Sequence, residues 1–254
     1  MLRNVTSCAW LVVLCGAAFA QSGPTVEELI SKSVAARGGV DKIKAIDSLK
    51  ISGKGVAMNG IEVPVTVYMK RPGMMRSEVK IQDKLIVQAF DGTDAWSINP
   101  LTGGDAPQKA DEEMSKRMRD NAQSMMDGYL TNYKAKGYQV ELVGKEDVES
   151  SPAYKLKITT KDGSIVYDYL DAKTYLEVRS TAKTKQMGQE IEVDSYSSDY
   201  KPVNGVMLPY TVDQRVNGMS MMKMVFEKTE ANVPMEGSIF QFPVAGDGKP
   251  EEKK

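Results

Sequence analysis

Residues 63–72 read Val-Pro-Val-Thr-Val-Tyr-Met-Lys-Arg-Pro, and this stretch decides the fold. Apolar residues alternate with more solvent-exposed positions at Val63, Val65, Val67 and Met69. This period of two predicts a strand with one apolar face. The same alternation carries Arg71 onto the apolar side, just where the strand ends. A guanidinium at that point could anchor either a ligand head group or a covering helix.

The runs on either side of this strand repeat the pattern, so a meander of about five strands is predicted from Ser48 to Pro100. Asp91-Gly92 is a hairpin signal within it, and Asp91 and Asp94 flank that turn, where aspartate favours local backbone hydrogen bonds rather than acid–base chemistry. The apolar positions are assigned, with the arginine, to one continuous surface: Val63, Val65, Val67, Met69, Arg71, Met75, Val79, Leu85, Val87 and Trp96.

Two glycines, Gly53 and Gly55, fall on the apolar face of the strand that begins near Ser48. Glycine inside a strand marks either a bend in a curved sheet or a place where another group approaches the backbone closely. The sequence leaves both alternatives open.

Residues 101–108 are rich in glycine and proline and are predicted to form a loop. Helical spacing follows, and it predicts a helix from Met114 to Leu130 with one apolar stripe. Methionine dominates the stripe, and the chain has 16 methionines against five phenylalanines. Such a stripe is either ordinary core or an adaptable cover over a binding surface, because methionine is flexible and polarisable. The candidate lid residues are Met114, Met118, Met125, Met126 and Leu130.

The remaining segments also follow simple patterns. Thr25 and Glu28 form a capping box for a first helix, which Gly38-Gly39 ends before a short helical turn at residues 40–46. Strands are predicted from Tyr138 onward, with residues 219–228 apolar on both faces and residues 239–243 as a short closing strand.

The first twenty residues are predicted to be a secretory signal peptide. An apolar run from Ala9 to Ala20 ends in Ala18-Phe19-Ala20, which matches a cleavage site before Gln21. We therefore expect an exported, soluble, periplasmic protein without a lipid anchor. Residues 21–244 are expected to form one domain, and residues 245–254 a polar, disordered tail.

Composition excludes several function classes. The chain contains no histidine, and both cysteines lie within residues 1–20. This argues against His-dependent nucleophile systems and most zinc sites, so we expect no enzyme activity, no cofactor and no metal. Removing Arg3 with the signal leaves 32 basic against 34 acidic residues and a net charge of −2. Without a basic block, nucleic acid is not an expected partner.

Three short pieces, taken in order, resemble the LolA/LolB-type family of outer-membrane lipoprotein-sorting proteins. They are Lys70-Arg71-Pro72, Asp91-Gly92 with Trp96 and Asn99-Pro100, and Phe240-Gln241-Phe242-Pro243. The resemblance implies a mainly β (α+β) fold, an incomplete antiparallel barrel or strongly curved sheet with helices over its concave apolar face. It also implies that Arg71 helps to hold the lid, and that the apolar surface defined above is a lipid-binding cavity.

The resemblance further implies a monomeric carrier of lipoprotein or lipid acyl chains, working between an inner-membrane exporter and an outer-membrane acceptor. The chain is longer than a typical carrier in its second half, so the cargo can differ from lipoproteins. The alternative is a lipid- or lipoprotein-sensing regulatory protein of the same fold in envelope-stress signalling. A lipid- or glycan-acting enzyme is disfavoured, because acid–base residues are not gathered at any place in the sequence.

Overall fold

The structure is a computed structural model that describes residues 23–57, 59–102, 104–186 and 189–243. The predicted signal peptide, residues 1–20, and the predicted polar tail, residues 245–254, therefore lie outside the described residues. Within the described ranges, no helix combines the length and the apolar character needed to cross a membrane.

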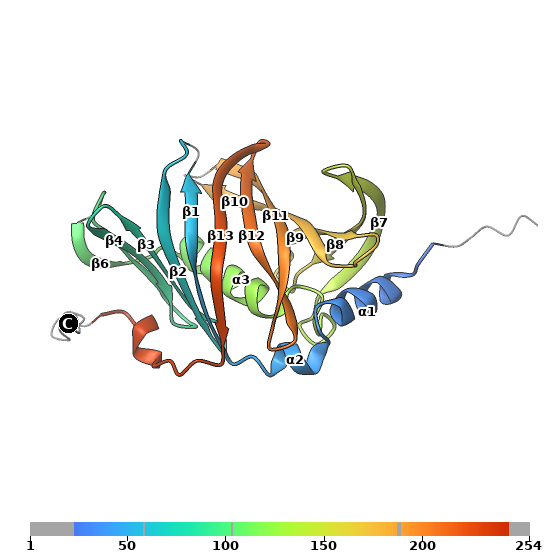
Figure 1. Ribbon diagram of the computed structural model, residues 1–254, viewed down its shortest axis with the longest axis horizontal. Helices are drawn as coiled ribbons and strands as arrows, with labels where there is room; N and C mark the ends of the chain where they lie inside the picture. The colour runs from blue at the N-terminus through green and yellow to red at the C-terminus, as the bar shows by residue number, and fades with distance from the viewer. Residues whose placement is uncertain (1–22, 58, 103, 187–188, 244–254) are drawn as a thin grey trace, which may run out of the picture.

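One antiparallel sheet of thirteen strands forms the body of the described chain (Figure 1). Its spatial order is β6-β5-β4-β3-β2-β1-β13-β12-β11-β10-β9-β8-β7, and its two edges do not pair with each other. The strands are β1 (Ser48–Ala57), β2 (Glu62–Lys70), β3 (Met74–Ile81), β4 (Lys84–Phe90), β5 (Ala95–Asn99), β6 (Gly104–Lys109), β7 (Gln139–Val148), β8 (Ser151–Thr159), β9 (Ile165–Asp171), β10 (Glu177–Gln186), β11 (Gln189–Val203), β12 (Val206–Val216) and β13 (Met219–Ala231).

The order of the strands explains where the longest helix lies. The edge strands β6 and β7 are consecutive in the chain, and the connection between them contains α3 (Glu112–Asp127). The chain must therefore cross one face of the sheet to pass from edge to edge. Figure 1 shows α3 behind the central strands β1, β13 and β12. The predicted fold class, an open antiparallel half-barrel with helices on one face, is confirmed.

Within the part of the chain that the structure describes, two further helices precede the sheet and one 3-10 helix follows it. Helix α1 (Val26–Ala36) begins with the predicted capping box, in which the Thr25 hydroxyl accepts from the Glu28 amide at 3.2 Å and the Glu28 carboxylate accepts from the Thr25 amide at 2.9 Å. Helix α2 is Val40–Lys44, and the 3-10 helix η1 is Gly237–Phe240.

Three predicted segments are wrong in detail. Residues 104–109 form the edge strand β6 rather than a loop, which its proline permits because an edge strand needs partners on one side only. Helix α3 ends at Asp127, because Gly128 adopts a φ of 68° there. The predicted closing strand at residues 239–243 is the end of η1 followed by irregular chain, since this segment crosses a sheet face instead of pairing with an edge.

The two faces of the sheet can be assigned from the strand register. Residues opposite each other on antiparallel strands share a face, and Val65 pairs with Val79 while Met69 pairs with Met75. These four residues define the inner face, which packs against α3. Lys80 pairs with Leu85 and therefore lies on the other, outer face.

The glycines of β1 mark a bend. The register between β1 and β13 shifts at Ser52/Gly53, and a Cβ on Gly53 would meet the Val225 carbonyl oxygen of β13 at 2.2 Å. Gly55 is close to the side chains of Met222 and Val65, so neighbouring residues fill the space that it leaves. Both alternatives hold at Gly53, where the register shifts and the β13 backbone approaches closely. The apolar residues of segment 219–228 are not all buried in the core, because the side chains of Met219 and Met221 are exposed to solvent.

Candidate functional site

The inner face of β1 to β3 is a continuous apolar surface. Most of the residues predicted to line a cavity lie on it, and Met69 is only 1% exposed. The residues of the predicted set that share this face are Val63, Val65, Val67, Met69, Met75 and Val79.

Three members of the predicted cavity lie on the opposite face. Val87 pairs with Glu78 and with Ile98, and Trp96 pairs with Ala89, so these residues and Leu85 are on the outer face. The assignment of Leu85, Val87 and Trp96 to the same surface as Val65 is therefore wrong. Strand β4 is apolar on both sides, with Ile86 and Phe90 facing inward, so its own alternation did not reveal which side was which.

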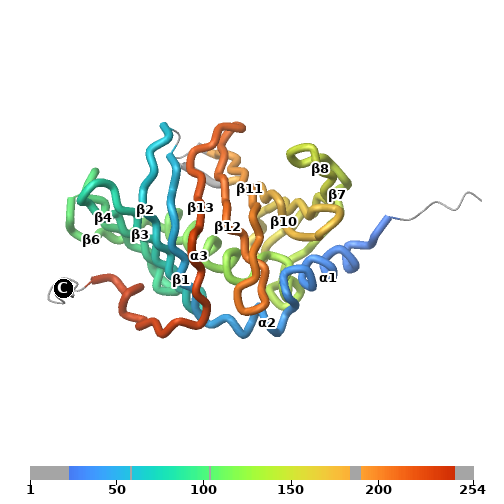
Figure 2. Tube along the Cα trace, in the orientation of Figure 1, coloured from blue at the N-terminus to red at the C-terminus, as the bar shows by residue number. Residues whose placement is uncertain are grey.

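The outer apolar patch is covered by the C-terminal segment, defined as residues 233–242. Trp96 is 1% exposed, and its indole Nε1 donates to the Phe240 carbonyl at 2.7 Å. The Phe242 ring meets Trp96 edge to face at 6.3 Å between centroids. Figure 2 shows this segment running from the end of β13 toward the strands of the first meander.

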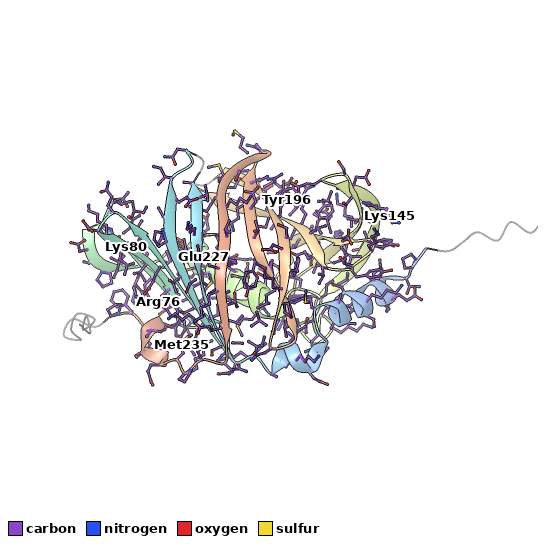
Figure 3. All side chains as sticks on the ribbon, viewed as in Figure 1. Arg76, Lys80, Lys145, Tyr196, Glu227 and Met235 are labelled. Atoms are coloured by element: carbon purple, nitrogen blue, oxygen red, sulfur yellow. The ribbon has the colours of Figure 1, made fainter. Side chains whose placement is uncertain are left out.

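Arg76 anchors the same segment. Its guanidinium donates to the Ile239 carbonyl at 2.8 Å, pairs with Glu78 at 2.7 Å and lies over the Trp96 ring. Figure 3 places Arg76 beside the C-terminal segment and Lys80 farther along β3, away from it. The register places Arg76 opposite Tyr68 on the outer face, and nothing in the sequence indicated that it holds a covering segment.

Helix α3 covers the inner face mainly through small and flexible side chains. Met126 and Ala122 pack against the β1–β3 surface, and Met125 packs against it while half-buried. At the other end of the helix, Met118 and Met114 pack against Phe90. Of the predicted lid residues, Leu130 alone lies outside the helix, and it packs on β8 and β9 with α1.

Arg71 joins the sheet to two helices. Its Nη2 pairs with the Asp127 Oδ1 at 2.6 Å, at the last residue of α3. The same guanidinium donates to the Ile46 carbonyl at 2.8 Å and to the Ile43 carbonyl at 3.1 Å, in and just after α2. The predicted use of this guanidinium as an anchor for a covering helix is confirmed. Its role in opening stays a prediction.

Two further cations, which the sequence did not single out, meet at the same end of α3. The Arg37 Nη1 donates to the Asp127 carbonyl at 2.7 Å, and the Lys136 Nζ donates to the Gly128 carbonyl at 2.7 Å. Cations stabilise a helix C-terminus, and the last turn of α3 has no basic residue of its own. An acidic residue in that position is the one sequence signal that points to outside cations. We call Arg37, Arg71, Lys136 and Asp127 the latch.

The latch is partly buried and electrostatically strained. Burial lowers the pKa of Lys136 to about 8, with Arg37 and Arg71 adding to the effect and Asp127 opposing it. Glycine suits this position because φ is 68° and ψ is 170° there, a conformation that strains other residues, and the Arg37 Nη1 occupies the space that a Cβ would need. The packing of a guanidinium against the backbone therefore ties the end of α3 to α1.

The inner face also holds a buried acid. Asp168 on β9 lies opposite Leu156, is 2% exposed, and its Oδ1 has no hydrogen-bond partner among the described residues. Burial raises the pKa of Asp168 well above its ordinary value, and the Glu177 carboxyl adds to this while Arg37 opposes it. Burial likewise raises the pKa of Glu177. A buried carboxyl oxygen without a hydrogen-bond partner costs stability.

An open groove lies between the first two helices and the segment that follows α3. Its volume is about 580 Å³, and apolar side chains form most of its surface. Ile30 and Val34 of α1 line one side, and Leu130 and Ala135 line the other. Ile30 and Leu130 also belong to the cluster that covers the inner face of β8 and β9, so the groove lies directly above that face.

Comparison with known proteins identifies the fold. No protein-family model matches the chain, and no curated protein matches it either. Solved structures do match over most of their length. A LolA superfamily protein from Nitrosomonas europaea is 13% identical with a TM-score of 0.53, over 86% of this chain and 98% of that one. The chain shares the fold of this structure.

Two other structures support the same fold. A DUF1329 family protein from Desulfovibrio piger is 15% identical with a TM-score of 0.57, over 85% of this chain and 97% of its own. A domain assigned to outer membrane lipoprotein sorting in Vibrio parahaemolyticus is 10% identical with a TM-score of 0.54, over 84% and 94%. At these identities the LolA-like likeness describes architecture, and function has to be argued from the site.

Proposed function

We propose that this protein is a non-enzymatic carrier that binds the acyl chains of lipids or lipoproteins on the inner face of its half-barrel. The signal-like residues 1–20 support a periplasmic location. The observation that carries the proposal is the way in which α3 covers this face, with methionine contacts along its length and an ionic latch at one end.

The energetics favour such a cover. Each buried CH₂ group contributes about 0.8 kcal/mol, so a chain of about sixteen carbons contributes on the order of 10 kcal/mol before the costs of binding. Displacing the helix and ordering the chain must offset most of that, otherwise the cargo could not be handed on. A cover made of methionine competes with a ligand at similar energy, because its side chains can repack around different shapes.

The fold supports the proposal through the lipoprotein-sorting assignment of one structure that shares it. The arrangement at Arg71 supports it independently, because a charged anchor that joins the apolar face to two helices can be broken and re-formed. The residues proposed to contact the acyl chain are those of the inner face. Leu85, Val87 and Trp96 are not among them.

Mass spectrometry of protein taken from its native host tests the proposal. We expect lipid or lipoprotein acyl chains to co-purify at up to one molecule per protein, and to be lost when α3 cannot open. Protein free of lipid that retains a stoichiometric protein partner would instead indicate the regulatory alternative.

A further inference from the structure

The latch carries more positive charge than its own carboxylate neutralises. Arg37, Arg71 and Lys136 all reach the end of α3, and among the described residues Asp127 is the one carboxylate that forms an ion pair with any of them there. Two other acids, Asp168 and Glu177, interact electrostatically with Arg37. Burial raises the pKa of both, which weakens them as counter-ions. Three cations against one carboxylate leave an excess of two positive charges at a partly buried position.

The latch already shows which chemistry it accepts. The Arg71 Nη2 holds a carboxylate oxygen at 2.6 Å, while the Arg37 Nη1 and the Lys136 Nζ each donate to a main-chain carbonyl at 2.7 Å. Guanidinium and ammonium groups bind carboxylate or phosphate more strongly than they bind neutral carbonyls. An incoming anion can therefore compete for all three cations, whereas the Asp127 carboxylate pairs with Arg71 alone among them.

An apolar groove lies beside the main chain that carries Arg37 and Lys136, although none of the latch side chains lines it. The groove of about 580 Å³ is lined by Ala35 and Gly39, which stand on either side of Arg37 in the chain, and by Ala135, which precedes Lys136. Its volume is within the range of small-molecule sites, about 300–1,000 Å³. A cationic cluster beside an apolar groove matches a molecule with an anionic head and an alkyl chain.

We propose that the anionic head group of a single-chain amphiphile, a carboxylate or a phosphate, binds Arg37, Arg71 and Lys136 in place of Asp127, with its alkyl chain starting in the groove. The exchange frees the C-terminal end of α3, so that head-group binding unlocks the helix. This inference rests on the proposed carrier function and names the head group that the carrier prefers.

The test uses the chain from Gln21 onward and three probes with the same alkyl chain: dodecanoate, dodecyl phosphate and dodecanol. Isothermal titration below the micelle concentration should show the anions binding at least about tenfold more tightly than dodecanol, as expected for charge-assisted hydrogen bonds. The tighter of the two anions distinguishes a fatty-acid source from a phosphate source. Asp127→Asn should tighten anion binding, because it removes the internal competitor.

Lys136→Gln should reduce the affinity for both anions and leave that for dodecanol unchanged, whereas Lys136→Arg should retain it. Lys44→Gln removes the same charge from an exposed position on α2 and serves as the matched control. Thermal unfolding of each variant shows whether it folds, and the anion preference of the unmodified chain needs no variant. Equal binding of dodecanol and dodecanoate by that chain would overturn this inference and leave the carrier function standing, whereas no binding of any of the three would overturn both.

Discussion

The sheet has a cover on each face, and the two covers are built differently. On the inner face, α3 rests on methionines and on a latch of charged groups that lies at one end. On the outer face, the C-terminal segment buries Trp96 and Phe240 almost completely and adds a buried indole-to-carbonyl hydrogen bond. Five residues apart, Arg71 anchors the first cover and Arg76 the second.

The difference separates a cover that can be exchanged from one that is part of the core. Aromatic side chains have few rotamers and defined contacts, so moving the outer cover would expose large rigid surfaces. Methionine contacts can re-form with another apolar partner, and an ionic latch can exchange one anion for another. The inner cover therefore has the properties of a lid, and the outer cover those of a structural strap.

The largest effect is expected on the outer side. Trp96→Ala should lower the free energy of unfolding by about 3–5 kcal/mol, because it leaves a cavity and unpairs the Phe240 carbonyl. Urea denaturation measures this change. Leu85→Ala on the same face is the control and should change stability by less than about 0.5 kcal/mol, since Leu85 is 41% exposed. A Trp96→Ala protein as stable as the control would contradict the strap.

Exchanging the two arginines for leucine sharpens the comparison. Arg71→Leu should cost about 1–2 kcal/mol, discounted because the pair is partly exposed, and should speed amide exchange in α3. Arg76→Leu should cost about 1 kcal/mol and speed exchange near residues 233–242. Hydrogen exchange with mass spectrometry reports both, and loosening of the same segment by both variants would argue against separate anchors.

The pH dependence of stability tests the buried acid of the inner face. The folded pKa of Asp168 is raised, so between its ordinary value and the raised value the native state binds more protons than the unfolded state. Stability from this group is therefore present at low pH and lost as pH rises through the raised pKa. Asp168→Asn should flatten that decline and add about 1 kcal/mol at neutral pH. A residual slope is expected from Glu177, which shifts in the same direction.

A small effect on stability is expected from the lid methionines. Replacing Met118 and Met125 by leucine should change the free energy of unfolding by less than about 1.5 kcal/mol, because the volumes are similar. Uptake of an environment-sensitive fatty-acid probe should nevertheless weaken, since leucine repacks less freely than methionine. Unchanged uptake, or an unfolded variant, would make α3 an ordinary core helix.

Alternation along single strands predicted the sheet and the inner face of β2, because each signal is local. It did not relate one strand to the next, and β4, with apolar residues on both sides, was therefore placed wrongly. The register that settles it comes from the tight turn that pairs Ile81 with Lys84. The outer apolar patch is covered by the segment that contains Phe240. This residue is 144 positions from Trp96 in the sequence, so no local pattern relates the two.

The latch was predicted in part for a similar reason. The alternation of residues along β2 predicted that the Arg71 guanidinium lies on the inner face. The apolar stripe of residues 114–130 predicted most of the helix that covers that face. Arg37 and Lys136 carry no local pattern, since they reach α3 from a helix end and from a loop. Long side chains that meet only after folding leave little trace in periodicity, and an acid at the end of α3 was the one hint.

Tethering α3 to the sheet tests the central claim most directly. Residues 21–254 contain no cysteine, so Ala95→Cys with Met118→Cys, two positions in one buried cluster, introduces a single possible disulfide. The account predicts that the oxidised protein loses uptake of the fatty-acid probe, that reduction restores it, and that each single-cysteine protein binds in both conditions. If the protein with a verified disulfide takes up the probe as well as its reduced form, α3 does not open and the carrier mechanism is wrong.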